Sequence, residues 1–229
     1  MPCRIMSVKS ANDAEFIEFQ RHLATRGNPS DGKGAAVEDQ VRAIIDDVCR
    51  RGDQALIERT RQFDAPGIEA PLAISQEELA RAAASISVED RSIIVDAAAH
   101  IREFHENQKE RSWFMTRDDG TVLGQKVEPV ERAGLYVPGG KGGNTPLISS
   151  MLMGAIPAQV AGVRDIAVVT PPRADGTVNP AILAAAKIAG VDRIFKVGGA
   201  QAIAALAYGT ESIPRVDKIV GPGNAFVAE

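Results

Sequence analysis

The chain has 229 residues, of which 45% are hydrophobic, 24% are charged and 4% are aromatic, and its formal net charge is -4. Such a chain can hold one large globular domain or two small ones. The negative charge argues against a nucleic-acid binder, which usually presents a basic face. No apolar run approaches the roughly 20 residues that cross a bilayer, so no membrane association is expected.

The start of the chain has no long apolar core, so a secretory signal is not expected. Cys3 and Cys49 are the only cysteines, and they form neither a disulfide framework nor a zinc knuckle. A cytoplasmic location is therefore expected.

Apolar residues recur at helical spacing through the first hundred positions, so this part is expected to be mostly helical. A first helix begins at Asn12 or Asp13. Residues 37–63 predict two more helices, because Gly52 interrupts the pattern, and Asp53 is expected to cap the second.

Two capping boxes mark the next helices. Ser75 with Glu78 begins a short helix, and Ser87 with Asp90 begins a longer one that ends near Lys109. The apolar residues expected along one side of the longer helix are Ile93, Ile94, Ala97, Ala98, Ile101 and Phe104.

A β-hairpin is expected near residues 113–127, because apolar β-formers flank the turn sequence Asp118-Asp119-Gly120. After it, one pattern occurs four times: a short apolar run, then a loop rich in Gly and Pro, then a helical segment. The four runs are residues 134–137, 165–169, 193–197 and 217–220.

Helices are expected after each of these runs. The first spans residues 146–163 and is interrupted at Pro157. The second begins at Asn179, which caps it. The third covers residues 200–208, and a fourth begins at Asn224.

Strands that alternate with helices form parallel sheets, and ligands bind at the carboxyl ends of such strands. Glycine-bearing loops follow three of the four runs, at residues 139–140, 198–199 and 221–223. Glycines let a ligand approach the backbone, and the N–H groups at a helix start favour an anion. The sequence thus predicts a site for a ligand with phosphates, although the glycines could instead serve only tight turns.

Four polar residues near these loops are candidates for ligand contact. Gln201 and Asn224 could hydrogen-bond a ribose, an amide or a base edge, with helix capping as the alternative role. Tyr136 could face the cleft, although a Tyr in an apolar strand is more often part of the core. Lys141 could meet a phosphate, but a solvated loop charge is the simpler interpretation.

Candidates for catalysis and metal binding are not found in the sequence. His22, His100 and His105 have no cysteine nearby, and the last two are five residues apart, which does not put them on one helix face. Hydride transfer from an alcohol needs a base and a group that polarises the oxygen. No convincing pair of residues offers either.

Several segments resemble histidinol dehydrogenase over nearly the whole chain from about Val37. These segments are residues 52–56 with 61–64, 134–140, 152–163, 197–210 and 216–224. The resemblance implies an α/β fold in which a helical N-terminal region joins a Rossmann-like, incomplete parallel-sheet dinucleotide-binding domain. It implies that residues 1–130 belong to a discontinuous first domain and residues 131–229 to the NAD-side domain.

The resemblance also implies an activity, the oxidation of L-histidinol to L-histidine with two NAD+ in histidine biosynthesis. It further implies that the enzyme requires zinc and is a homodimer. By matching motifs, it assigns NAD contacts to Tyr136, Gln201 and Asn224. In that family the zinc ligands and catalytic residues lie in the C-terminal half, so this chain alone is expected to be inactive.

Residues 141–145 depart from the family pattern and look like an insertion. Two alternatives stay open, the first because of this insertion and the second because the family's C-terminal half is not matched. One is a paralogous NAD-dependent dehydrogenase that acts on another small polar alcohol. The other is a non-catalytic remnant that binds NAD or a partner.

Overall fold

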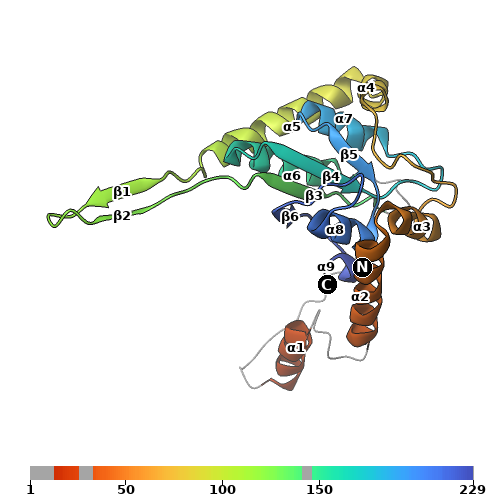
Figure 1. Cartoon of the computed structure of the whole chain (residues 1–229), viewed down its shortest axis with the longest axis horizontal. Coiled ribbons are helices and arrows are strands. Elements are labelled where there is room, and N and C mark those ends of the chain that lie inside the picture. The colour runs from red at the N-terminus through yellow and green to blue at the C-terminus, as the bar shows by residue number, and fades with distance from the viewer. Residues whose placement is uncertain (1–12, 26–32, 141–145, 229) are drawn as a thin grey trace.

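The structure is a computed structural model that describes residues 13–25, 33–140 and 146–228 (Figure 1). Its N-terminal elements are α1 (Ala14–Thr25), α2 (Lys33–Arg51), α3 (Asp53–Phe63), α4 (Gln76–Ser85), α5 (Val88–Glu106), β1 (Trp113–Thr116) and β2 (Val122–Gln125). The remaining elements are β3 (Arg132–Tyr136), α6 (Ile148–Ala161), β4 (Asp165–Thr170), α7 (Pro180–Ile188), β5 (Arg193–Lys196), α8 (Gly199–Tyr208), β6 (Lys218–Val220) and α9 (Ala225–Ala228).

The main sheet has four parallel strands in the order β5-β4-β3-β6. β3, the first strand of this sheet in the chain, is therefore central, with β4 and β5 on one side of it and β6 on the other. This is the arrangement of the first four strands of a Rossmann sheet, whose order reverses beside the first strand. The fold is α/β with a Rossmann-like sheet and a helical N-terminal region, as the sequence predicted.

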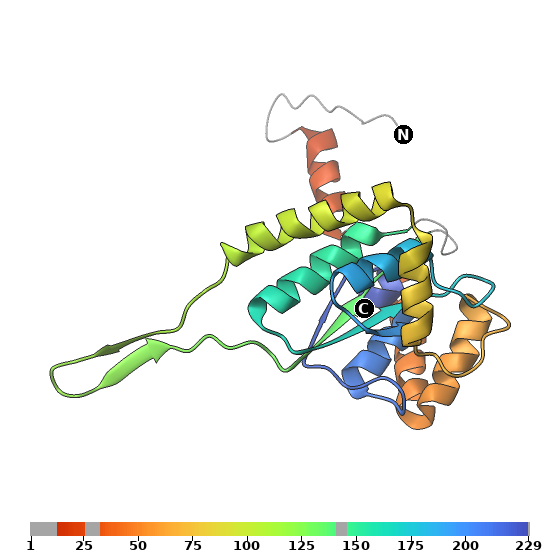
Figure 2. The same cartoon turned by 90° about the horizontal axis from the view of Figure 1, so that it is seen from above.

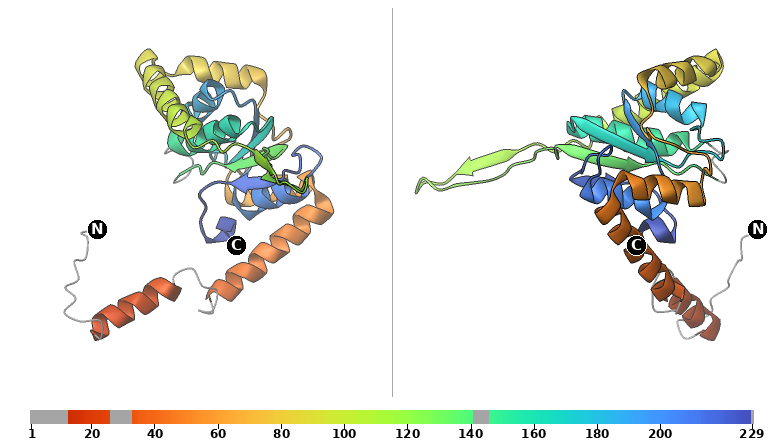
Figure 3. Two further views of the ribbon diagram at one scale, coloured as in Figure 1. Left: turned by 90° about the vertical axis from the view of Figure 1, so that its left-hand side faces the viewer. Right: turned by 45° about the vertical axis from the view of Figure 1, so that its right-hand side comes forward.

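Helices cover both faces of this sheet, as parallel strands require (Figure 3). On one face, α4, α5, α6 and α7 bury a core that includes Leu79, Ile94, Met151 and Leu183. On the other, α2, α3 and α8 bury a core around Leu56 and Leu206. The helices of the N-terminal region thus pack on both faces, and the division of the chain at residue 131 stays a prediction.

The hairpin of β1 and β2 extends from the body as an arm (Figure 2). The strands pair from Trp113 opposite Gln125 to Thr116 opposite Val122. At the turn, Gly120 has a positive φ of 83°, and the Asp119 carboxylate accepts a hydrogen bond from the Thr121 N–H. The predicted hairpin is confirmed.

Three helix starts are also confirmed by their caps. The Ser75 hydroxyl accepts from the Glu78 N–H at 3.0 Å, and the Ser87 hydroxyl accepts from the Asp90 N–H at 2.9 Å. The Asn179 side chain accepts from the Ala181 N–H at 3.0 Å. Each cap satisfies a helix N–H that has no partner within the helix.

The predicted capping role of Asp53 is wrong. Gly52 is the N-cap of α3, with φ of 52°, and no side chain of its own closes the helix. Asp53 is the first helical residue, and its N–H donates to Glu211 at 2.8 Å. A carboxylate distant in the sequence therefore satisfies the free N–H that a local cap was expected to bind.

Helix α5 ends at Glu106, before the expected Lys109, and its buried stripe is narrower than predicted. Ile94 is buried, but Ile93 and Phe104 are 60% and 61% exposed. Adjacent positions on a helix lie about 100° apart around its axis. A narrow buried stripe therefore covers Ile94 and leaves its neighbour Ile93 in solvent.

Helix α6 continues through Pro157, where an interruption was expected. Proline removes one backbone hydrogen bond, which near the last turn of a helix costs less than in its middle. Ile156 and Val160, on either side of Pro157, are buried against the sheet. Their packing holds the last turn in place.

Candidate functional site

A pocket of about 640 Å³ lies at the carboxyl ends of the parallel strands. It is lined by Gln40, Ile44, Phe63, Asp64, Tyr136, Pro138, Gly139, Gly140, Leu147, Pro171, Gly199, Ala200, Gln201, Pro222, Gly223, Asn224 and Phe226. Loops after all four strands contribute, so the glycine loops do share one edge. The pocket sits where the strand order reverses, which is where Rossmann-type sheets bind dinucleotides.

Tyr136 is the last residue of β3, and it both packs in the core and lines the pocket. The hydroxyl oxygen accepts a hydrogen bond from the Gly199 N–H at 3.2 Å. Burial raises the pKa of Tyr136, and the nearby charge of Asp64 raises it further. The residue thus combines the core role and the cleft-facing role that the sequence left as alternatives.

Gln201 is in the first turn of α8 and is only 1% exposed. Its amide nitrogen is buried and has no hydrogen-bond partner among the described residues. A buried donor without a partner is costly, and such groups in native proteins usually meet a ligand or an ordered water. An acceptor atom of a ligand in this pocket fits the unmet donor.

Asn224 precedes α9 and is exposed at the rim of the pocket. Its side-chain oxygen accepts from the Phe226 N–H at 3.1 Å, so the capping role considered from the sequence is present. The amide nitrogen, the other end of the same group, stays available as a donor. Capping holds the side chain in place and does not compete with ligand contact.

The pocket wall also holds residues that sequence reasoning did not single out. Gln40 and Ile44 come from α2, and Phe63 and Asp64 from the end of α3. Burial raises the pKa of the Asp64 carboxyl to about 6. Phe63 and Asp64 fall in a segment that carried the family resemblance, which was the only sequence signal available for them.

The other sequence candidates lie away from this site. His100 and His105 are on α5, where His105 makes an edge-on contact with Phe104. Lys141 and the suspected insertion at residues 141–145 are outside the described residues, as is the side chain of His22. Within the described ranges, no group of three His, Cys, Asp or Glu side chains could hold a metal ion, and no helix there could span a membrane.

The donors present fit a dinucleotide. Gln201 supplies an unmet amide N–H and Asn224 a second amide, and the hydroxyl of Tyr136 accepts a hydrogen bond from the N–H of Gly199 at the start of α8. Glycines along the lining, such as Gly139 and Gly140, let a ligand approach the protein backbone closely.

Comparison with known proteins points the same way. The family model described as histidinol dehydrogenase matches residues 28–229. The histidinol dehydrogenase of Nitratidesulfovibrio vulgaris is 57% identical over 99% of this chain and 51% of its own length. That of Oleidesulfovibrio alaskensis is 53% identical over the same shares.

A solved structure, the histidinol dehydrogenase of Elizabethkingia anophelis, superimposes with a TM-score of 0.78 at 39% identity. It covers 83% of this chain, which in turn covers 43% of that one. The chain spans about half the length of the curated relatives it matches. With the family model matching residues 28–229, the chain belongs to the histidinol dehydrogenase family.

Proposed function

We propose that this chain is the NAD-binding portion of a histidinol dehydrogenase, which oxidises L-histidinol to L-histidine in histidine biosynthesis and requires zinc. The observation that carries the proposal is the unpartnered, buried amide nitrogen of Gln201. Gln201 lines a pocket at the strand-order switch that Tyr136 and Asn224 also line. Membership of the histidinol dehydrogenase family supports the proposed substrate and reaction class.

NAD, when bound, supplies the hydride acceptor, and this chain's residues bind and orient it. Gln201 donates its free N–H to the ligand. Tyr136 accepts from Gly199, so its own hydroxyl proton is free to bind an acceptor. Asn224 presents an amide whose orientation the α9 cap fixes.

The catalytic residues and zinc ligands are proposed to lie outside this chain. The 229-residue chain alone should then bind NAD without oxidising histidinol. Purified protein is mixed with L-histidinol, NAD and zinc, and NADH is followed by its absorbance. Formation of NADH that depends on histidinol would contradict this part of the proposal.

Titration of NAD against single variants tests the cofactor site. Gln201→Ala and Asn224→Ala should each weaken NAD binding, the first by about tenfold, because a donor lost from a buried site leaves a ligand acceptor unpaired. Gln62→Ala is the matched control, because Gln62 is exposed on α3 and does not line the pocket. Unchanged affinity in both pocket variants would remove the assignment.

We further propose that the full-length protein is a cytoplasmic homodimer, divided into a discontinuous first domain and an NAD-side domain from residue 131. The arm supports the dimer, because Trp113, Phe114 and Val122 are more than half exposed there and exposed apolar patches mark interfaces. Cys49 is a free thiol within the described residues, which is consistent with a reducing compartment. Sedimentation of the full-length protein with and without the arm tests the dimer.

A further inference from the structure

Asp64 is the only charged residue among the described residues that line the pocket. Its carboxylate makes no hydrogen bond or ion pair within the described part of the chain. It is close enough to Tyr136 for its charge to raise the pKa of the tyrosine hydroxyl. A half-buried carboxylate without a partner is costly, and such groups collect at functional sites.

The backbone around Asp64 is held firmly. Asp64 and Ala65 both donate their N–H groups to the Thr60 carbonyl at 2.9 Å, which closes the end of α3. Ala65 is fully buried, and the Arg61 side chain donates to the Ile68 carbonyl at 2.8 Å. The carboxylate is therefore presented to the pocket by a fixed turn.

We propose that Asp64 accepts hydrogen bonds from a ribose diol of the dinucleotide and thereby sets the preference for an unphosphorylated ribose. This inference rests on the proposed NAD-binding function and adds a residue to it. A carboxylate has two acceptor oxygens, which match two neighbouring hydroxyl donors. The same pairing of a carboxylate with ribose hydroxyls recurs in dinucleotide-binding sheets.

The charge around the pocket supports the same choice. A ribose 2′-phosphate usually needs an Arg or Lys partner, and the described lining residues include neither. Asp64 would repel such a phosphate and leave it unpaired. Both effects favour NAD over NADP.

The test is titration of the full chain with NAD and with NADP, using Asp64→Asn at pH 7.5. The wild-type chain should bind NAD more tightly than NADP. Asp64→Asn should weaken NAD binding by about tenfold, since hydrogen bonds to a charged acceptor are lost. If the diol belongs to the adenosine ribose, the variant should also bind NADP better than the wild type does. If both ligands weaken equally, the diol is that of the nicotinamide ribose, and the proposed role of Asp64 in the preference for NAD is overturned.

Glu69→Gln is the matched control, because Glu69 is exposed, lies five residues away and is not part of the pocket. It removes the same charge and should leave both affinities unchanged. If NAD binding weakens equally in Asp64→Asn and Glu69→Gln, the loss of affinity comes from the change in net charge alone, and the inference is overturned. The inference would also be overturned if Asp64→Asn bound NAD as tightly as the wild type while Gln201→Ala bound it more weakly. That result would leave the proposed function standing. Failure of the wild-type chain to bind either dinucleotide would overturn both.

Discussion

The hydroxyl oxygen of Tyr136 accepts a hydrogen bond from the backbone N–H of Gly199 at 3.2 Å. This bond joins the end of β3 to the first residue of α8, two elements 63 positions apart in the sequence. It also fills one of the N–H groups that a helix start leaves free. The same tyrosine therefore contributes to the core, caps a helix and lines the pocket.

Replacing this tyrosine should separate the contribution of its hydroxyl from that of its ring. Tyr136→Phe keeps the buried ring but leaves the Gly199 N–H without its acceptor. We expect the free energy of unfolding to fall by about 1 kcal/mol, the usual value of one such bond. Urea unfolding measures this change, and NAD titration should show weaker binding.

Tyr208→Phe is the control for that experiment. Tyr208 is 59% exposed at the end of α8 and does not line the pocket. Losing its hydroxyl should change neither stability nor NAD affinity. If the two variants behave alike, the hydrogen bond to Gly199 has no measurable role.

Asp53 joins the start of α3 to the loop after α8. Its carboxylate accepts from the Thr210 hydroxyl at 2.6 Å and from the Ser212 hydroxyl at 2.9 Å. Asp53→Ala leaves both hydroxyls without this acceptor, so we expect a loss of about 1–3 kcal/mol of stability. Thermal or urea unfolding checks it. Asp46→Ala, at an exposed position of α2, should be nearly neutral.

The contrast between local and distant contacts explains which features could be predicted from the sequence. The caps at Ser75, Ser87 and Asn179 bind N–H groups two or three residues away, so a short motif was enough to predict them. The parallel arrangement of the strands followed from the alternation of strands and helices.

Contacts that depend on tertiary packing were missed. Asp53 was expected to cap its own helix, yet its partners lie more than 150 residues away, beyond any local pattern. Asp64 acquires its raised pKa from burial beneath neighbouring elements, which no spacing of residues reveals. Gln201 could be predicted as a ligand contact because it follows two glycines at a helix start. Only the structure shows that its buried amide nitrogen has no partner among the described residues.

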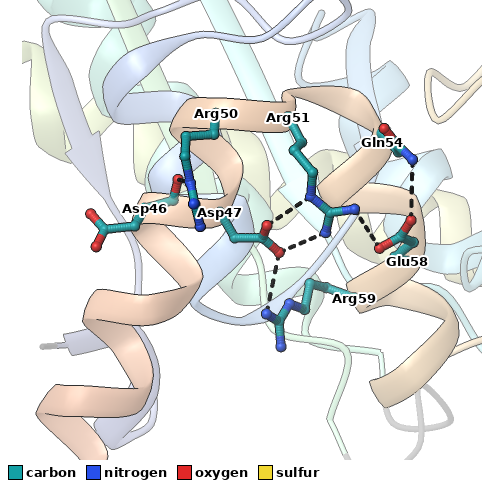
Figure 4. Close-up of polar contacts among 7 residues, drawn as sticks. All are labelled: Asp46, Asp47, Arg50, Arg51, Gln54, Glu58 and Arg59. Atoms are coloured by element: carbon teal, nitrogen blue, oxygen red, sulfur yellow. Dashed lines mark hydrogen bonds and ion pairs between the residues drawn. The ribbon is translucent and has the colours of Figure 1, made fainter.

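Asp47 on α2 is the centre of an ion-pair cluster that should make stability depend on pH (Figure 4). Its carboxylate accepts two hydrogen bonds from Arg51, both at 2.8 Å, and one from Arg59 at 3.2 Å. The bond from Arg51 is the largest cause that lowers the pKa of Asp47 to about 2. Arg51 also binds Glu58 at 2.7 Å, which joins α2 to α3.

The folded pKa of Asp47 is below its ordinary value of 3.8, so the cluster stabilises the fold fully above that value. This contribution should be lost as the pH falls from about 4 towards 2. Asp47→Asn should lower the free energy of unfolding by about 1 kcal/mol at pH 7. Below pH 4 the stabilities of the variant and the wild type should become more alike. Urea unfolding at several pH values measures it. Asp46→Asn, whose side chain points away from the cluster in Figure 4, should give a curve parallel to the wild type.

Asp64 should have the opposite effect on stability. Burial raises its folded pKa from 3.8 to about 6, so between these values the folded state holds the proton more tightly than the unfolded state. Stability contributed by this group is therefore present below about pH 4 and is lost as the pH rises through 6. At neutral pH the buried charge destabilises the fold.

Asp64→Asn should for this reason make the protein more stable at pH 7.5, by about 1–2 kcal/mol once partial exposure is allowed for, and leave it unchanged near pH 4. Urea unfolding at both pH values measures this gain. Glu69→Gln is the control and should have the stability of the wild type at both pH values. A residue kept only for structure would lose stability on replacement. A gain, combined with weaker NAD binding in the same variant, is what a group retained for its ligand should show, because such groups commonly reduce stability in favour of function. A loss of stability at pH 7.5 would show instead that the carboxylate has a stabilising partner.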